Sequence, residues 1–536
     1  MSGAEAAVAA LQVHGIDTVF GLPGFQLDQL FCALHDRKDR LRVINARHEQ
    51  GVAYMALGYA QATGRAGVYA VVPGPGFLNT TAALSTAYAC GAPVLALVGQ
   101  IETAAIGRGS GEFHELPDQS GVLERLTRWC GLASRAHDVP ALLAEAFGRL
   151  AAGQAPVGVE LPMDVLAQSD AIGTIKPQPR PAEPAIDREA VRAAAKVLDG
   201  ARAPLIFVGG GAIDAAGDLK HVAEFLQSPV VSHRQGRGIL DSRDPLSIGP
   251  YEGSKLWAGS DVVLAVGTRF HSAWKGWHLR PGQKVIRIDR GTAQFSRGGA
   301  PDLAITGDAK VVLSSLAEEL EWSGRRHTSR KDELARLKLW AASQFERRLA
   351  PQMAFVGSLR SALPDDAILV ADYTQVGYVA AATFPVDRPR RMITPGYQGT
   401  LGFAFATALG AKVACPDRAV VALVGDGGFL FTANELATAV MHGIRTVTIV
   451  FVDGAYGNVR RAQEIDYGGK VIASDLHNPD FVRFAESFGA AARCARTPDE
   501  LVDCLAWAMA QDVPAVIEVP VANMPDPWAL LEPVAA

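Results

Sequence analysis

Short apolar runs alternate with longer helical patterns over most of this 536-residue chain. In the N-terminal part, LRVINAR is followed by EQGVAYMALGYAQATG, and AGVYAVVPGPG is followed by FLNTTAALSTAYACG. Continuous apolar strands that alternate with helices are typical of a parallel sheet covered by helices on both faces. The pattern therefore predicts an α/β chain built from doubly wound parallel sheets.

Two segments interrupt this alternation and divide the chain into three parts. The first, QSDAIGTIKPQPRPAEPAID, carries four prolines between residues 177 and 184 and predicts a stiff, extended linker. The second, RRHTSRKDELARLKLWAASQFERRL, is highly charged and predicts a solvent-exposed helical connector. We therefore expect three doubly wound domains, over residues 1–167, 188–324 and 352–526, each close to the usual size of about 150 residues.

Composition and charge narrow the function classes. Hydrophobic residues make up 49% and charged residues 20%, which is typical of a globular protein rather than a disordered one. A net charge of −5 does not favour nucleic-acid binding. There is no signal-peptide pattern and no run of about 20 apolar residues. The six cysteines form no CxxC pair, which favours reduced, packed thiols. We expect a cytoplasmic protein without a membrane or nucleic-acid partner.

Two apolar strands of the C-terminal part end in carboxylates. Within VVALVGDGGFLF, the apolar strand ends at Gly425-Asp426-Gly427-Gly428. The next apolar strand, TVTIVFV, is followed by Asp453. Ligands of parallel α/β sheets bind at the carboxyl ends of strands, and carboxylates there suit Mg²⁺, which bridges to phosphate oxygens. Asp-Gly after a strand is also a common turn. If the two strands are neighbours, both carboxylates reach one ion.

These stretches resemble the thiamine-diphosphate-dependent enzymes. GDGGFLFTANELATAVMHGIRTVTIVFVDGAYGNVRR is similar to the cofactor motif of the superfamily that contains acetolactate synthase, benzaldehyde lyase and pyruvate decarboxylase. FGLPGFQLDQLF and INARHEQGVAYMALGYAQATG resemble its pyrimidine-binding domain. The resemblance covers nearly the whole chain, and it implies pyrimidine-binding, central and diphosphate-binding domains in this order.

The resemblance also implies a ligand set for Mg²⁺ and the diphosphate. The side chains of Asp426 and Asp453 and the carbonyl of Ala455 would hold the metal. The family commonly has Asn-Asn where this chain has Val452-Asp453, so an oxygen ligand is kept and one negative charge is added. Further cofactor-binding residues implied by the same motif, and by ADYTQVGY, are Gly427, Gly428, Tyr456, Gly457 and Gln375.

Glu49 occupies the position of the family's catalytic glutamate, which hydrogen-bonds the cofactor's aminopyrimidine and promotes loss of the thiazolium C2 proton. A Glu in a first helical turn is also a common partner of the helix dipole. In PGYQGTLGFAFATALGAK, the resemblance implies that Gly399 and Leu401 hold the aminopyrimidine, with Leu401 as the wedge that bends the cofactor. Asn79, in VVPGPGFLN, is a further cofactor neighbour.

Departures from the relatives bear on the reaction. Pyruvate decarboxylases carry an Asp after the first Pro-Gly, a His-His pair and a Glu after the metal strand, whereas this chain has Phe25, no His-His pair and Val459. The acid relay that releases a free aldehyde is therefore missing, which disfavours simple decarboxylation. Acetolactate synthases carry a Trp at the mouth of the site, where this chain has Ala462, so the acceptor has more room.

The polar segment GEFHELPDQ carries two further candidates. His114 falls where acetolactate synthases and benzaldehyde lyase place a substrate-facing Gln. A lone His is often structural, but here it is a candidate proton shuttle. Gln119, counted with Glu49 and His114 as catalytic, and Gln26 are candidates to polarise a donor carbonyl, and Phe25 is expected to narrow the donor pocket.

Several functions stay open. The first is a carboligase or lyase that acts on 2-oxo acids or acyloins through a C2 adduct and an enamine. Alternatives are a diketone C–C hydrolase, a simple 2-oxo acid decarboxylase and a catalytically silent cofactor-binding subunit. The expected partners are small molecules, namely a 2-oxo acid, an acyloin or an aldehyde.

Two further expectations concern the central domain and the assembly. GGGA at residues 209–212 lacks the spacing of a dinucleotide loop, so FAD in the central domain is considered but not favoured. The resemblance implies a homodimer or homotetramer in which Glu49 of one chain and Asp426 of its partner share a site.

Overall fold

The computed structural model describes residues 1–178, 185–270, 276–295, 299–323, 325 and 327–534. It contains three six-stranded parallel sheets with helices between the strands, which confirms the predicted α/β class. Of the four linker prolines, only Pro177 lies within the described residues. The three sheets fall inside the predicted domain ranges, whose exact boundaries stay a prediction.

The chain forms two compact units, which are described separately. The first unit comprises Met1–Pro181, Ile368–Tyr373 and Pro395–Pro520, and the second comprises Ala182–Ala367, Thr374–Thr394 and Val521–Ala536. The first unit therefore combines the N-terminal sheet with most of the C-terminal one, and the second contains the central sheet.

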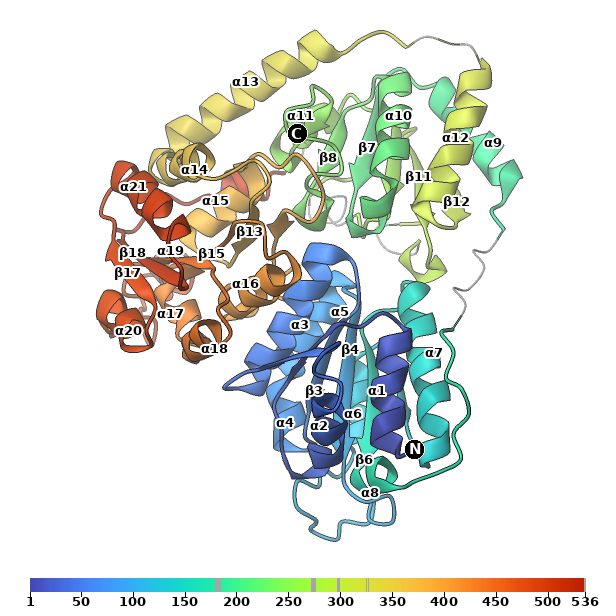
Figure 1. Cartoon of the computed structure of the whole chain (residues 1–536). Helices are drawn as coiled ribbons and strands as arrows, with labels where there is room; N and C mark the ends of the chain where they lie inside the picture. Colours follow the sequence, from blue (N-terminus) through green and yellow to red (C-terminus); the bar gives the residue numbers. More distant parts are fainter. Residues whose placement is uncertain (179–184, 271–275, 296–298, 324, 326, 535–536) are drawn as a thin grey trace. The chain divides into compact units, whose positions relative to one another are not determined.

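The N-terminal sheet has the strand order β2-β1-β3-β4-β6-β5. One face is covered by α1, α2, α7 and α8, and the other by α3, α4, α5 and α6 (Figure 1). The bounds are β1 (Thr18–Gly21), β2 (Arg42–Asn45), β3 (Gly67–Val71), β4 (Val94–Gln100), β5 (Trp129–Leu132), β6 (Val157–Pro162), α1 (Gly3–Val13), α2 (Asp28–His35), α3 (Glu49–Thr63), α4 (Pro75–Asn79), α5 (Thr81–Cys90), α6 (Gln119–Leu126), α7 (Val139–Ala151) and α8 (Met163–Ala167).

Five strands of the C-terminal sheet lie in the first unit, in the order β13-β15-β16-β18-β17. The sixth strand is β14 (Met392–Ile393). The bounds of the other elements are β13 (Ile368–Ala371), β15 (Val420–Gly425), β16 (Val447–Val452), β17 (Ala491–Cys494), β18 (Ala515–Pro520), α16 (Phe403–Ala414), α17 (Asp426–Phe429), the 3₁₀ turn η7 (Ala433–Glu435), α18 (Leu436–Met441), α19 (Gly457–Ile465), α20 (Phe481–Ser487) and α21 (Pro498–Met509).

Helices α3 and α16 join the two sheets of the first unit, and both lie against their own sheet (Figure 1). Two glycines permit the close crossing. A Cβ atom on Gly58 would lie 1.9 Å from the carbonyl oxygen of Thr407, and one on Gly410 would lie 1.8 Å from that of Met55. Both positions thus exclude any side chain, and the helix that begins with Glu49 is fixed against the C-terminal sheet's helix.

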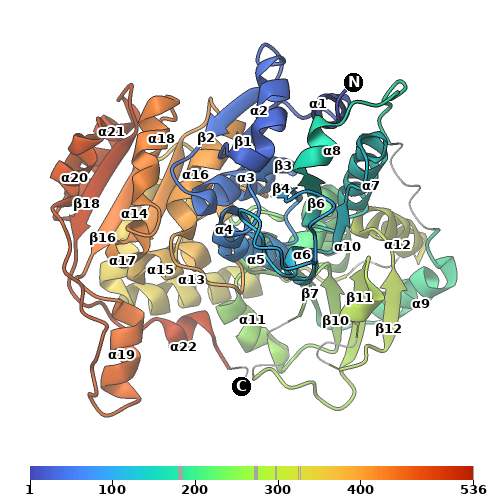
Figure 2. The same ribbon diagram turned by 90° about the horizontal axis from the view of Figure 1, so that it is seen from below.

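The second unit is built on the central sheet, with the order β12-β11-β10-β7-β8-β9 (Figure 2). Helices α9, α10 and α12 pack together on one face, and α11 contacts β8. The bounds are β7 (Pro204–Val208), β8 (Val230–Ser232), β9 (Ser247–Ile248), β10 (Val262–Val266), β11 (Lys284–Asp289), β12 (Leu303–Thr306), α9 (Arg188–Asp199), α10 (Ala216–Leu226), α11 (Pro250–Trp257), α12 (Ala309–Ser323), α13 (Lys331–Arg348), α14 (Ala350–Ala362), α15 (Gln375–Thr383) and α22 (Trp528–Leu531).

The glycines considered for a dinucleotide loop are explained by packing. A Cβ atom on Gly209 would lie 2.6 Å from the carbonyl oxygen of Gly267, and one on Gly211 would lie 2.8 Å from the Cα atom of Gly267. The turns after β7 and β10 therefore touch backbone to backbone. These glycines are accounted for without a cofactor, so they provide no support for FAD.

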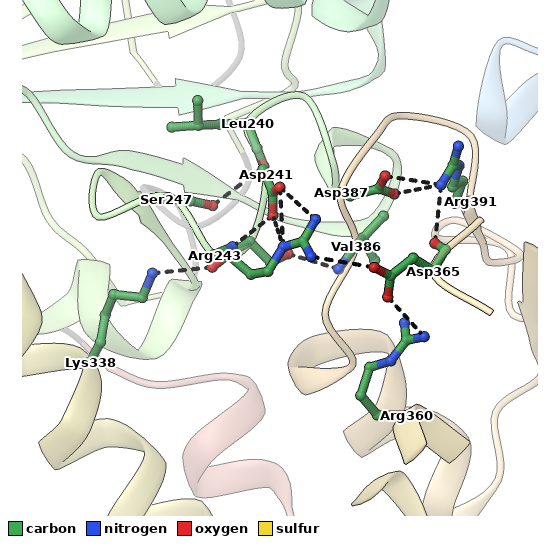
Figure 3. A network of polar contacts seen from close by, with 11 residues as sticks. Leu240, Asp241, Arg243, Ser247, Lys338, Arg360, Asp365, Val386, Asp387 and Arg391 are labelled. Carbon is green, nitrogen blue, oxygen red and sulfur yellow. Dashed lines mark hydrogen bonds and ion pairs between the residues drawn. The ribbon is translucent and has the colours of Figure 1, made fainter. Parts of the chain in front are cut away.

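Charged side chains tie the segment around residues 365–391 to the central domain (Figure 3). Arg243 pairs with Asp241 at 3.0 Å and with Asp365 at 3.5 Å, and Arg360 reaches Asp365 at 3.2 Å. The side chains of Arg243 and Asp365 are more than half exposed, so each such pair contributes only about 0–1 kcal/mol. The network therefore contributes little to the stability of the unit, and its main effect is on the path of this segment.

Two further findings concern the whole chain. Among the residues that the structure describes, no helix has both the length and the apolar character needed to cross a membrane. The six cysteines are free thiols, and only Cys32 is exposed. The thiol state agrees with the expectation of reduced cysteines.

Candidate active site

The two strand-end carboxylates come from neighbouring strands. β15 and β16 pair in parallel, with Gly425 opposite Phe451, so Asp426 and Asp453 follow adjacent strand ends. Neighbouring strands are about 4.8 Å apart. The condition set by the sequence, that the strands be adjacent, is therefore confirmed.

Asp426 is a buried carboxylate with its oxygens held by the protein. Its side chain is 1% exposed. Oδ1 accepts from the backbone N–H of Gly427 at 2.8 Å, and Oδ2 accepts from the N–H of Gly454 at 2.8 Å and from Asn478 Nδ2 at 2.7 Å. The carboxylate is therefore oriented before any ion arrives.

The loop after β16 is fixed by a short antiparallel contact. Tyr456 donates its N–H to the carbonyl of Ser474, and Leu476 donates to the carbonyl of Gly454, both at 2.8 Å. Gly454 has φ +69°, a conformation that favours glycine. Asp453 accepts from the N–H of Ala455 at 3.2 Å. The bridge therefore fixes the backbone that carries Asp453 and the Ala455 carbonyl.

The oxygen atoms at this edge fit Mg²⁺ bound to a diphosphate. In the described part of the chain, no three His, Cys, Asp or Glu side chains gather in a way that could hold a metal. The possible metal ligands are the carboxylates of Asp426 and Asp453 and the carbonyl of Ala455. The Asn478 Oδ1 atom, beside Asp426, is buried without a hydrogen-bond partner in the described structure. Mg²⁺ prefers such hard oxygens and completes its shell with water and substrate phosphates.

Gly427 and Gly428 lie where neighbouring side chains leave little room. A Cβ atom on Gly427 would lie 2.6 Å from the Tyr456 ring, and one on Gly428 would lie 3.3 Å from Asp372 Oδ2. Asp372, which the sequence analysis missed, is 3% exposed and accepts from the N–H of Ala404 at 3.4 Å. Burial raises the pKa of Asp372 to about 7.

Glu49 is the first residue of α3, directly after β2, as predicted. His48 caps the helix, with Nδ1 accepting from the N–H of Gln50 at 3.1 Å. The Glu49 side chain is half-buried, and Asn79 Nδ2 donates to its Oε2 at 2.9 Å. Gly76 passes close by, since a Cβ atom there would lie 3.5 Å from Glu49 Oε1. The predicted residues Glu49 and Asn79 are thus brought together.

The segment of Gly399 and Leu401 has the properties of a binding loop. Gly399 has φ +62°, and a Cβ atom there would lie 2.8 Å from the Tyr373 ring. Thr400 shares a 2.7 Å hydrogen bond with Thr86 of α5. Leu401 is 37% exposed, so it is not a core leucine. An exposed leucine on a fixed loop is consistent with the predicted wedge.

Residues 101–118 form no helix or strand and carry His114. Gln26 is 2% exposed and holds this loop, because its Nε2 donates to the carbonyl of Phe113 at 2.7 Å and its Oε1 contacts His114 Nδ1 at 3.1 Å. The Phe113 and His114 rings stack at 3.8 Å. Phe25 is 59% exposed. The Gln26 side chain is therefore bonded to the protein itself. The surface of this region is formed by His114, Phe113 and Phe25.

Gln119 belongs to a buried network. It is 2% exposed, its Oε1 accepts from the N–H of Gly74 at 2.9 Å, and its Nε2 donates to Glu160 at 2.8 Å. Gly74 has φ +58°, and a Cβ atom there would lie 2.5 Å from the carbonyl oxygen of His114. The structure thus places Gln119 behind the turn that faces Glu49 and His114, with both ends of its amide already bonded.

Comparison with known proteins identifies the family. Residues 1–122, 191–316 and 372–519 match the models of the N-terminal TPP binding domain, the central domain and the C-terminal TPP binding domain of thiamine pyrophosphate enzymes. The chain belongs to the thiamine-diphosphate-dependent enzyme family. Its first and third parts are thus thiamine-diphosphate-binding domains, and the chain is an enzyme.

Similar members of this family have different named activities. The chain is 32% identical to a probable 2-ketoarginine decarboxylase (AruI) of Pseudomonas aeruginosa, over 97% of this chain and 94% of that protein. It is also 32% identical to the acetolactate synthase isozyme 3 large subunit of Escherichia coli K12, over 95% and 92%. A probable acetolactate synthase large subunit of Methanocaldococcus jannaschii is 32% identical, over 97% and 92%.

One predicted cofactor residue of this thiamine-diphosphate enzyme falls in the second unit. Gln375 begins α15, and its Oε1 accepts from the N–H of Met524 at 2.7 Å. The role of Gln375 in cofactor binding stays a prediction. Sequence reasoning also missed Glu160, Asn478 and Glu435, because each acts on a partner far away in the sequence.

Proposed function

We propose that this thiamine-diphosphate enzyme uses Mg²⁺ to make or break C–C bonds of 2-oxo acids or acyloins. The observation that carries the proposal is the Glu49 carboxylate, which starts α3, stays half-buried and is oriented by Asn79 at 2.9 Å. A glutamate placed in this way can exchange a hydrogen bond or a proton with a heteroaromatic ring nitrogen. Asp426, Asp453 and the Ala455 carbonyl would hold Mg²⁺ and thereby the diphosphate.

The chain's own residues would orient the reactants. The chemistry that thiamine diphosphate supplies when bound is a carbon nucleophile and a sink for the electron pair of a broken C–C bond. Leu401 would pack against the cofactor, and the Gly399 backbone would hold its aminopyrimidine. His114 would give or take a proton at the substrate oxygen through Nε2, since Nδ1 contacts Gln26.

The surroundings of the site support carboligation. Val459, at the position where pyruvate decarboxylases carry an acidic residue, is 53% exposed and cannot supply a proton. Without that acid, the donor fragment is retained until an acceptor arrives. Phe25 and Phe113 offer exposed aromatic surface for an apolar part of the substrate.

A second candidate is a decarboxylase that acts on a larger 2-oxo acid. It is supported by the relative named as a probable 2-ketoarginine decarboxylase and by His114, which offers an alternative proton donor to the missing acid. In this case His114 would supply the proton that an aldehyde product requires.

Product analysis separates these candidates. The holoenzyme would be incubated with ¹³C-labelled pyruvate or 5-guanidino-2-oxopentanoate, with and without a second 2-oxo acid or an aldehyde, and the products followed by NMR. A carboligase gives an acyloin or a 2-hydroxy-3-oxo acid that contains carbon atoms of both a donor and an acceptor, the acceptor being the added compound or a second molecule of the 2-oxo acid. A decarboxylase gives the aldehyde alone, at a rate that the acceptor does not change. Absence of any product from 2-oxo acids, with cleavage of a diketone, would replace both proposals by a hydrolase.

We also infer a homodimer or homotetramer and a cytoplasmic location. The inference of an oligomer rests on the family resemblance, and that of location on the six free thiols.

A further inference from the structure

A segment of the C-terminal sheet lies over the junction between β2 and α3, where Glu49 begins its helix. This segment is η7 together with α18, and it follows the metal-side carboxylate Asp426 along the chain. The segment and the junction both belong to the first unit. The junction is therefore held by residues far away in sequence.

Glu435 makes the central contact. Its side chain is 0% exposed. Oε1 accepts from the backbone N–H of His48 at 3.0 Å and from that of Arg47 at 3.2 Å, and Oε2 lies 3.1 Å from the same Arg47 nitrogen. Thr438 Oγ1 donates to Oε2 at 2.5 Å. A buried carboxylate thus binds the two N–H groups that directly precede Glu49.

The backbone of α3 is shaped to admit this carboxylate. A Cβ atom on Gly51 would lie 2.4 Å from Glu435 Oε1, so a side chain there would displace the Glu435 carboxylate. The first turn of α3 therefore approaches Glu435 as closely as backbone permits. Arg47 and His48 precede the helix, so no carbonyl of the helix itself is available to their N–H groups.

We propose that Glu435 is a positioning residue for Glu49. It fixes the backbone on the N-terminal side of Glu49, while Asn79 fixes the side chain. This inference rests on the proposed role of Glu49. An error of about 1 Å in the placement of a catalytic group can reduce a rate by about 100-fold, so an anchor two residues away affects chemistry as well as folding.

A second contact between the same segments offers a matched control. His442, which follows α18, contacts Asn45 Oδ1 through Nε2 at 2.8 Å, and Arg42 donates to the His442 carbonyl at 3.3 Å. These bonds attach the end of β2 and leave Arg47 and His48 untouched. If Glu435 only stabilises the packing of two parts of the unit, loss of the His442 side chain should have the same effect as loss of the Glu435 side chain.

The variants are Glu435→Ala, Glu435→Gln and His442→Ala. The glutamine oxygen can still accept from Arg47 and His48, and its NH₂ group can donate to Thr438 Oγ1, so Glu435→Gln should preserve the junction. The first measurement is amide hydrogen exchange of the cofactor-free protein. We expect exchange at Arg47 and His48 to be faster by about 10-fold or more in Glu435→Ala and to be unchanged in the other two variants.

The second measurement is the exchange rate of the thiazolium C2 proton in thiamine diphosphate bound to each variant, by acid quench and proton NMR. We expect a fall of about 10- to 100-fold in Glu435→Ala, with cofactor affinity within about 3-fold of wild type, and near wild-type rates in the other variants. Equal losses in Glu435→Ala and His442→Ala, or unchanged amide exchange in Glu435→Ala, would overturn the inference. A wild-type protein that does not accelerate C2 exchange would instead refute the proposed function, and the amide exchange test would still stand.

Discussion

Three carboxylates of the first unit sit in different surroundings, and these differences assign them different tasks. Glu49 is half-buried with one side-chain donor, Asn79, so it can exchange hydrogen bonds with a ligand. Asp426 is buried and accepts three hydrogen bonds, which fix the direction of both carboxylate oxygens at the proposed metal site. Asp372 is buried among weaker contacts, and burial raises its pKa to about 7.

The first prediction concerns Glu49. Glu49→Gln keeps a hydrogen-bond acceptor for Asn79 but removes the carboxyl group that is proposed to exchange a proton with the cofactor. We expect C2-proton exchange of bound thiamine diphosphate to fall by about 100- to 10,000-fold, the usual contribution of general acid–base catalysis. Cofactor affinity, measured by fluorescence titration, should change by less than about 10-fold. Wild-type exchange in Glu49→Gln would assign activation to another group.

The second prediction concerns Asp372 in the cofactor-free protein. Its pKa is raised from 3.8 to about 7 on folding, so between these values the folded state retains a proton that the unfolded state has lost. Stability therefore falls as pH rises through this range, by up to about 1.4 kcal/mol per pH unit for this group.

The test compares Tm of wild type and Asp372→Asn at several pH values. The amide side chain introduced by this substitution does not titrate. The Tm of the variant should therefore rise steadily relative to the Tm of wild type from about pH 4.5 to about pH 7, with no further rise above about pH 7.5. A Tm difference independent of pH would show that Asp372 titrates normally.

At the level of elements, the sequence predicted what local pattern determines. The strand that precedes Asp426, the helix that begins at Glu49 and the glycine turn at Gly74 follow from hydrophobic periodicity, helix-start and turn signals. The sequence gives the adjacency of β15 and β16 only as a condition for a shared ion site, because strand order depends on packing between distant segments. Glu435 stands inside the stretch used to identify the family, yet its partner His48 is 387 positions away.

The surroundings of two candidate glutamines also depend on contacts between distant parts of the sequence. Gln26 and Gln119 are next to turns in the sequence, where polar side chains usually face solvent. In the structure both are 2% exposed and bond to the protein. Their environment comes from Phe113 and Glu160, whose proximity no periodicity indicates. Gln26 thus holds the loop that carries His114, and Gln119 holds the turn at Gly74.

The third prediction tests the crossing of α3 and α16. Gly58→Ala places a methyl group 1.9 Å from the carbonyl oxygen of Thr407, so the helices must separate. We expect a loss of stability on the order of 1–3 kcal/mol, seen as a lower Tm and faster proteolysis.

The matched control is Gly357→Ala in α14, where a Cβ atom meets nothing within 4 Å. Alanine there should be neutral or stabilise the protein by about 0.5–1 kcal/mol, because glycine is a poor helix former. A Gly58→Ala protein with unchanged Tm would mean that the two helices do not cross closely.

At the scale of the whole molecule, the first unit combines both thiamine-diphosphate-binding domains in one body. Glu49 and Asp426 are thus carried by one compact framework, and Glu435 belongs to the same segment as Asp426. Whether the two carboxylates serve one site or two sites of a dimer is a question about assembly.

The fourth prediction addresses this question with two inactive variants. Each of Glu49→Gln and Asp426→Ala disables one half of a site. If every site combines Glu49 of one chain with Asp426 of its partner, a mixed dimer holds one intact site and one doubly altered site. Random exchange of subunits should then restore about a quarter of wild-type activity, because about half of the dimers are mixed and each has one working site of two. Subunit exchange would be verified with differently tagged chains. Verified exchange without recovery would place both carboxylates of a site in the same chain.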